Sequence, residues 1–179
     1  MTVDDNTLLK MLASPETKRK AFGLIVSQYS EMLYWKIRHF VLYHEDADDV
    51  MQNVLMKAWM NIDRVKADSK ISTWLYCIAV NESLDFLRRK KNVADADADL
   101  YAARHLMADE YFDGDATEAL LQEAIARLPD MQRTVFLLRY YDEMKYSEMS
   151  KMLERTEGAL KANYHIAAQK VLDYIKHRD

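Results

Sequence analysis

Residues 147–171 read SEMSKMLERTEGALKANYHIAAQKV, and the spacing of their apolar residues predicts two consecutive helices. A first helix is expected to open at Ser147, with an apolar face made by Met149, Met152 and Leu153. The connection Glu154-Arg155-Thr156 follows, and Thr156 is a good N-cap for the next helix. That helix repeats apolar residues every three or four positions, which indicates one buried face: Leu160, Tyr164, Ala167, Val171 and Ile175.

Two helices joined by a three-residue turn form a helix-turn-helix, whose second helix can lie in the major groove of DNA. The outward face of this second helix would show Gly158, Lys161, Ala162, His165 and Gln169. Small residues let the backbone approach the groove, and Lys161 can reach a phosphate or a guanine edge. The alternative is a helical hairpin that packs against the rest of the protein and binds nothing.

The rest of the chain is also expected to be helical. Only three glycines and two prolines occur in 179 residues, whereas sheets depend on turns rich in such residues. Apolar residues recur at helical spacing in 18–41, 46–62, 72–91 and 120–128, and Pro129 suits the first turn of one more helix. The prediction is an all-α protein with two small bundles. Its segments are an N-terminal extension (1–17), a first bundle (18–92), a linker (93–117) and a second bundle (118–179).

The net charge of −4 is unevenly distributed along the chain. Residues 93–118 contain eight acidic residues and the single basic residue Arg104, so the remainder of the chain is net positive. This acidic, alanine-rich stretch suits a linker better than a core. The two flanking bundles can therefore still bind nucleic acid.

Several classes of function are disfavoured by the composition. The single cysteine, Cys77, allows neither an internal disulfide nor a thiolate cluster for a metal. No Gly-rich phosphate loop, zinc-protease motif or Ser–His pair is present, so we expect no catalysis and no cofactor. The N-terminus lacks the pattern of a secretory signal, and no apolar run is long enough for a membrane span. The expected location is the cytoplasm.

Two polar faces of the first bundle are candidate binding surfaces. The run HEDADD (44–49) offers N-capping side chains for a helix near Asp46, and Asp49, Gln52 and Asn53 project away from its buried stripe. This face could be a capped helix start or a docking surface for a protein; calcium-loop spacing is missing. The following helix, capped by Ser72 or Thr73, carries Asn81, Asp85 and Arg88 on one face and ends in a basic run. That end could hold DNA or could simply complement the helix dipole.

Three motifs together resemble one family, the extracytoplasmic-function sigma factors of bacterial RNA polymerase. DADDVMQNVLMKAWMNIDRV (46–65) and KISTWLYCIAVNESLDFLRRKK (70–91) are similar to region two of that family. LQEAIARLPDMQRTVFLLRYYDEMKYSEMSKMLERTEGALKANYHIAAQKV (121–171) is similar to region four. The resemblance covers roughly 18–178 apart from the linker.

The resemblance implies a dissociable polymerase subunit that recognises and melts promoters and initiates transcription. It implies that region two docks on the beta-prime clamp helices through Asp46, Asp48, Asp49, Gln52 and Asn53. It implies that region two also binds the melted minus-ten strand, with these candidates: Lys66, Ser69, Lys70, Ser72, Thr73, Asn81, Arg88 and Arg89. Region four would touch the beta flap and read the minus-thirty-five duplex through Thr156, Gly158, Lys161, Ala162, Asn163 and His165. An anti-sigma protein is the expected inhibitor.

Some residues depart from the family pattern, and rival functions remain. Glu154 stands where the family usually has Gly, so the turn is expected to differ slightly, and Ala162-Asn163 replaces a frequent Ser-Arg pair. One rival is a stand-alone helix-turn-helix regulator, which would need neither the acidic helix start nor the Ser-x-x-Trp region. Another is a helical adaptor that binds only protein.

Overall fold

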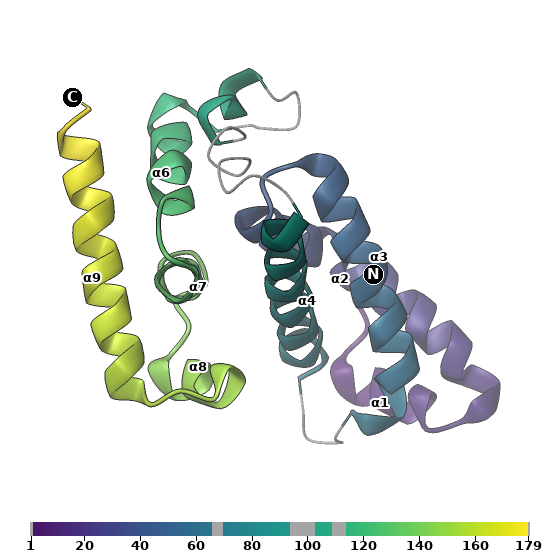
Figure 1. Cartoon of the computed structure of the whole chain (residues 1–179). Coiled ribbons are helices and arrows are strands. Elements are labelled where there is room, and N and C mark those ends of the chain that lie inside the picture. Colours follow the sequence, from purple (N-terminus) through teal and green to yellow (C-terminus); the bar gives the residue numbers. More distant parts are fainter. Residues whose placement is uncertain (1, 66–69, 94–102, 109–113, 179) are drawn as a thin grey trace. The chain divides into compact units, whose positions relative to one another are not determined.

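A computed structural model of the chain describes residues 2–65, 70–93, 103–108 and 114–178, and helices are the only regular secondary structure among these residues (Figure 1). The all-α prediction is confirmed. The chain forms two compact units, Met1–Val93 and Ala94–Asp179. No helix in the described ranges combines the length and apolarity that a membrane span requires.

The first unit is a bundle of four helices. They are α1 (Asp5–Leu12), α2 (Pro15–Phe40), α3 (His44–Asn61) and α4 (Ile71–Val93), with a 3-10 turn, η1 (Ile62–Arg64), after α3. Helices α2, α3 and α4 pack against one another. Their core contains mainly aliphatic residues, including Ile25, Leu33, Ile37, Val50, Val54, Leu75 and Val80. Burying such side chains supplies most of the stability of a helical bundle.

The N-terminal extension forms a helix that belongs to this bundle. Helix α1 begins after Asp4, whose carboxylate accepts a hydrogen bond from the Thr7 amide, and its Leu8 is completely buried. The backbone N–H and C=O of Val3 are both bonded to the Gln28 side-chain amide of α2. Val3 and helix α1 are therefore integral to the first unit, which the sequence did not predict.

The start of α3 differs from the prediction. The helix begins at His44, and its N-cap is Tyr43, without a capping side chain. The acidic residues lie inside the first turns, where they complement the helix dipole and cap nothing. Helical spacing also predicted Trp59 on the buried stripe of this helix; that prediction is wrong, because Trp59 is 42% exposed and Ala58 takes the buried position instead. Trp59 packs beside Phe22, with ring centroids 5.1 Å apart.

The start and the buried face of α4 also differ from the prediction. The helix begins at Ile71, so Ser72 and Thr73 lie within its first turn and do not cap it. The buried residues are Ile71, Leu75, Tyr76, Ala79, Val80, Glu82 and Ser83. Helical spacing predicted that six apolar residues face inward, but Val80 alone of these is buried, and the other five are partly exposed: Trp74, Cys77, Ile78, Leu84 and Leu87. Burial raises the pKa of the Cys77 thiol, which keeps it in its less reactive form.

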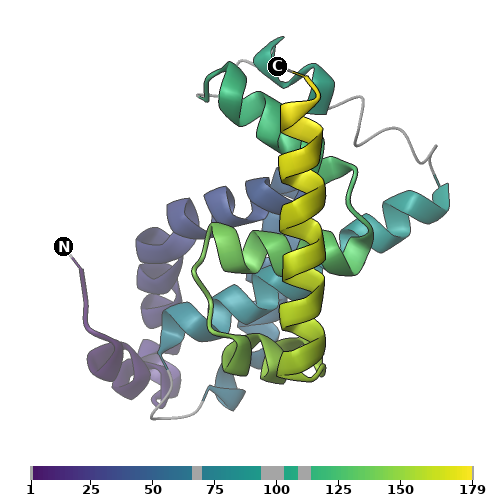
Figure 2. The ribbon, with the colours of Figure 1, turned by 90° about the vertical axis from the view of Figure 1, so that its left-hand side faces the viewer.

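The second unit is built around α7. Its helices are α6 (Ala116–Ala126), α7 (Asp130–Tyr140), α8 (Tyr146–Leu153) and α9 (Glu157–Lys176). Six consecutive residues of α7, 133–138, are buried, as is expected of a helix surrounded by others. Helix α9 packs on α6, α7 and α8 and extends along the whole unit (Figures 1 and 2). Pro129 is the N-cap of α7, next to its predicted place in the first turn.

Part of the predicted linker packs on the second unit. Ala103 and Leu106 are buried, and the short helix η2 (Leu106–Ala108) contacts α6. Apolar side chains here gain from burial, so 103–108 is not a spacer. The prediction of a linker for 94–102 and 109–113 falls outside the described residues.

Candidate nucleic-acid interface

The turn between α8 and α9 keeps a left-handed residue at the position where glycine is usual. Glu154 has φ 54° and ψ 45°, and its amide donates to the Ser150 carbonyl. Glycine adopts this conformation without steric cost, whereas Glu pays for a Cβ contact. Glu154 thus holds a backbone conformation that favours glycine, and this lowers the stability of the turn.

Helices α8 and α9 are joined by a small buried contact and a capped start. Met149 of α8 and Leu160 of α9 are both buried, and the two helices pack against each other. The Thr156 hydroxyl accepts a hydrogen bond from the Ala159 amide at 3.3 Å, which confirms Thr156 as the N-cap. The first turns of α9 are thus held at a defined angle to α8.

The outer face of α9 is exposed as its spacing predicted. Gly158, Lys161, Ala162 and His165 all lie on the surface, as does Thr156 at the cap. A Cβ placed on Gly158 would meet no atom within 4 Å, so the fold itself does not require glycine there. Asn163 is different because it is half-buried and its amide donates to the Ala159 carbonyl at 2.8 Å. That bond makes Asn163 the least available of the residues predicted to contact DNA.

A second cation, Arg139, lies at the same aromatic ring as Lys161, and the sequence did not predict it. The Tyr146 ring has the Lys161 ammonium 5.6 Å from its centroid and the Arg139 guanidinium 5.3 Å from it. Arg139 also donates to the carbonyls of Glu143 and Met144, both at 3.1 Å, which fixes the turn before α8. Nothing in the local pattern could show this, because α7 and α9 meet only in the folded unit.

The exposed face of α4 forms a polar row on the first unit. Lys70, Thr73, Asn81 and Arg88 are exposed and lie at helical spacing, opposite the buried face. The Arg88 guanidinium lies 3.1 Å from the Asp85 carboxylate, so part of its charge is compensated. Ser72 is half-buried and Arg89 is exposed. Lys66 and Ser69 are outside the described residues.

At the start of α3, part of the predicted acidic binding face is paired within the protein. The Asp46 carboxylate is 2.5 Å from the Lys90 ammonium of α4, and both side chains are largely buried. Asp48 lies 3.4 Å from the His44 ring. Lys90, which lies 44 positions away in the sequence, thus supplies a cation to this acidic face. Asp49 and Gln52 remain exposed, with Asn53 half-buried beside them. Within the described ranges, no three potential metal-binding side chains come together.

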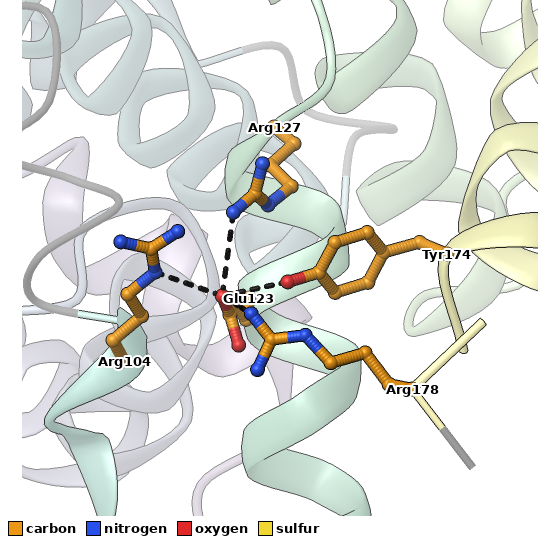
Figure 3. Close-up of polar contacts among 5 residues, drawn as sticks. All are labelled: Arg104, Glu123, Arg127, Tyr174 and Arg178. Atoms are coloured by element: carbon orange, nitrogen blue, oxygen red, sulfur yellow. Dashed lines mark hydrogen bonds and ion pairs between the residues drawn. The ribbon is translucent and has the colours of Figure 1, made fainter.

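A buried carboxylate anchors the far end of α9 (Figure 3). Glu123 of α6 is 5% exposed. Its Oε1 accepts hydrogen bonds from Tyr174 at 2.7 Å, Arg104 at 2.9 Å and Arg178 at 3.1 Å, with Arg127 at 3.5 Å. Burial by itself raises the pKa of Glu123, but the Tyr174 and Arg104 hydrogen bonds and the charges around them hold the pKa below its ordinary value. The cluster connects 103–108, α6 and the C-terminus.

The fold and these faces define a class: a helical protein of two domains, with a helix-turn-helix in the second and a polar helix face in the first. Comparison with known families then identifies the domains. Residues 25–93 match Sigma-70 region 2, and residues 118–171 match Sigma-70, region 4.

Individual relatives agree with this assignment. The ECF RNA polymerase sigma factor SigW of Bacillus subtilis is 33% identical over 156 residues, which is 81% of this chain and 83% of the relative. The sigma-E factor of Escherichia coli is 27% identical, covering 86% of this chain and 85% of its own. The chain belongs to the extracytoplasmic-function sigma factors. It directs RNA polymerase to promoters and is not an enzyme.

Solved structures show the same fold. CnrH, in complex with the cytosolic domain of CnrY, superimposes with a TM-score of 0.68 at 23% identity, covering 98% of this chain and 99% of that one. The sigma factor RpoE in complex with the anti-sigma factor NepR, from Bartonella quintana, gives a TM-score of 0.66 at 20% identity, covering 88% and 98%.

Proposed function

We propose that three exposed faces of this sigma factor bind three different partners. The first turns of α3 bind core polymerase, the outer face of α4 binds the melted minus-ten strand, and the outer face of α9 reads the minus-thirty-five duplex. The observation that supports these roles is that each face carries exposed residues at helical spacing, opposite a buried face of the same helix.

The α3 face suits a basic protein partner. Asp49 and Gln52 are exposed one turn apart, and the acidic first turn is stabilised by the helix dipole. Asp46 has a different role here: its ion pair with Lys90 fixes α3 against α4 and leaves little of the carboxylate for a partner. The proposed polymerase contact is therefore centred on Asp49, with Asp48, Gln52 and Asn53 around it. The beta-prime clamp helices are the proposed partner surface.

The α4 face suits single-stranded DNA. Asn81 can pair with an exposed base edge, while Lys70, Arg88 and Arg89 supply charge for phosphates. Ser72 and Thr73, in the first turn of α4, add hydroxyl groups beside them. Lys66 and Ser69 stay in the proposal through the family resemblance alone. Melting the promoter requires such a face, because separated strands must be held apart from each other.

The α9 face suits duplex DNA with few direct contacts. Gly158 and Ala162 leave room for the groove, and Lys161 is the cation nearest to them on the exposed face. Binding through one or two charges is weak. We therefore propose that contact with the beta flap holds this domain at the promoter and raises its local concentration there.

An inhibitory protein is the remaining proposed partner. Two solved relatives with this fold were captured in complexes, CnrH with CnrY and RpoE with the anti-sigma factor NepR. This supports the proposal that an anti-sigma protein also regulates this chain.

Transcription by reconstituted polymerase tests the roles proposed for the three faces. Purified core enzyme with this protein should initiate at defined sites on genomic DNA, and mapping those sites gives the promoter sequence. Asp49→Lys should reduce core binding in a pull-down without lowering thermal stability.

Glu16→Lys is a matched charge reversal on the same domain. Glu16 lies in the first turn of α2, and Lys18 of that turn pairs with Asp63, just after the end of α3, at 2.6 Å. Glu16 is therefore near the end of α3 that is opposite to Asp49. Asp49 lies 12 residues before the end of α3, or roughly 18 Å along the helix. Equal losses for the two variants would show a general charge effect and would refute the proposed anchor.

A further inference from the structure

The start of α4 is capped by a residue 66 positions earlier in the chain. The Ile71 amide, at the first residue of α4, donates a hydrogen bond to Asp5 Oδ2 at 3.0 Å. Asp5 belongs to α1. A helix N-terminus has amide groups without partners in the helix, and a carboxylate there also complements the helix dipole. The cap therefore comes from the tertiary structure and replaces the local one expected from Ser72 or Thr73.

Asp5 is itself held in place from a second side. The Tyr29 hydroxyl of α2 donates to Asp5 Oδ1 at 2.9 Å. Burial raises the pKa of Tyr29, and the hydrogen bond to Asp5 and the Asp5 charge raise it further, so the phenol stays a donor. The two oxygens of one carboxylate thus connect α2 with the start of α4. Buried Leu8 and Leu12 keep α1 on α2.

The position of this cap matters because of what α4 carries. Thr73 and Lys70 are exposed on either side of Ile71, and Asn81 follows two to three turns later on the same face. If the first turn of α4 frays or shifts, these polar groups lose their spacing. We propose that Asp5 is a positioning residue for minus-ten recognition, which holds the DNA-binding face of α4 in register. This inference rests on the role of α4 proposed above.

Four proteins test the idea, each assembled into holoenzyme: wild type, Asp5→Ala, Asp5→Asn and Asp4→Ala. Asp4→Ala is the matched control because it removes a neighbouring carboxylate that caps α1 alone. Asp5→Asn is the conservative variant. Its amide oxygen can still accept from Ile71, and the Tyr29 hydroxyl can turn to accept from the amide nitrogen.

The DNA probe is a promoter duplex with a single-stranded minus-ten segment, taken from a start site mapped with the wild-type holoenzyme. Asp5→Ala should bind it about tenfold more weakly, which corresponds to about 1.4 kcal/mol and is within the range for loss of a helix cap. Core binding should be unchanged. Asp5→Asn should recover most of the affinity, and Asp4→Ala should match wild type. Equal affinity of Asp5→Ala and wild type would overturn the proposal, as would a parallel loss of core binding.

Hydrogen exchange separates this inference from the function on which it rests. In Asp5→Ala the amides of residues 71–74 should exchange faster than in wild type and Asp4→Ala. Unchanged exchange would refute the cap even if DNA binding fell. If the exchange increases but wild-type holoenzyme shows no preference for the single-stranded segment over duplex, the role of α4 in minus-ten binding is refuted, and with it the positioning role.

Discussion

Replacing Glu123 by glutamine should destabilise the second domain by about 1–2 kcal/mol, and alanine should cost about 3 kcal/mol. The carboxylate is almost fully buried and accepts from Tyr174 and two arginines within 3.1 Å. A hydrogen bond to a buried charge contributes about 1.5–3 kcal/mol. The two arginines are nearly half exposed, so the hydrogen bond of each contributes only about 0.5 kcal/mol. Glutamine keeps an acceptor and loses the charge. Alanine also leaves the Tyr174 hydroxyl without its acceptor.

Urea unfolding can resolve this effect within the intact protein. All three tryptophans, Trp35, Trp59 and Trp74, lie in the first domain, so their fluorescence reports only on that domain. Far-UV circular dichroism reports on both domains. Glu123→Gln should shift the dichroism transition of the second domain and leave the fluorescence transition unchanged. Glu157→Gln is the control, because this half-exposed residue lies 3.8 Å from Lys161 and should contribute less than about 0.5 kcal/mol.

The pH dependence gives a second test of the same reasoning. Because the pKa of Glu123 is lower in the folded protein than its ordinary value, its stabilising effect is fully present above that ordinary value and is lost as the pH falls through the folded value. The difference between wild type and Glu123→Gln should therefore shrink on acidification below about pH 4.5. Equal unfolding midpoints for the two proteins at pH 7 would refute the assignment of Glu123 as an anchor.

Glu154→Gly should stabilise the second domain by about 0.5–1 kcal/mol, since glycine adopts φ 54° without strain; a lower melting temperature would contradict this. A fragment starting at residue 94 should unfold at higher urea concentration than one starting at 118, because only the longer one keeps Leu106 and the Arg104–Glu123 pair. Lys161→Ala should weaken transcription from promoters with a matched minus-thirty-five element by about 1–3 kcal/mol if Lys161 contacts a base edge. Equal weakening on templates without the element would indicate a phosphate contact.

The sequence was sufficient for features that depend on neighbours along the chain. The scarcity of glycine and proline, together with apolar residues at helical spacing, predicted an all-helical protein. Thr156 was recognisable as a cap because its acceptor and the Ala159 amide are three residues apart. The exposed face of α9 followed from periodicity for the same reason. The motif order was enough to identify the family, which the comparisons confirm.

Only the tertiary structure decided the features that join distant segments. Asp5 caps Ile71 across 66 residues, Lys90 binds Asp46 across 44, and Arg178 reaches Glu123 across 55. A local pattern carries no signal for such pairs, because each polar residue alone is equally suited to solvent. The buried face of α4 was misassigned for a related reason: its apolar residues surround most of the helix, so periodicity could not select among them. Contact with α2 and α3 made that choice.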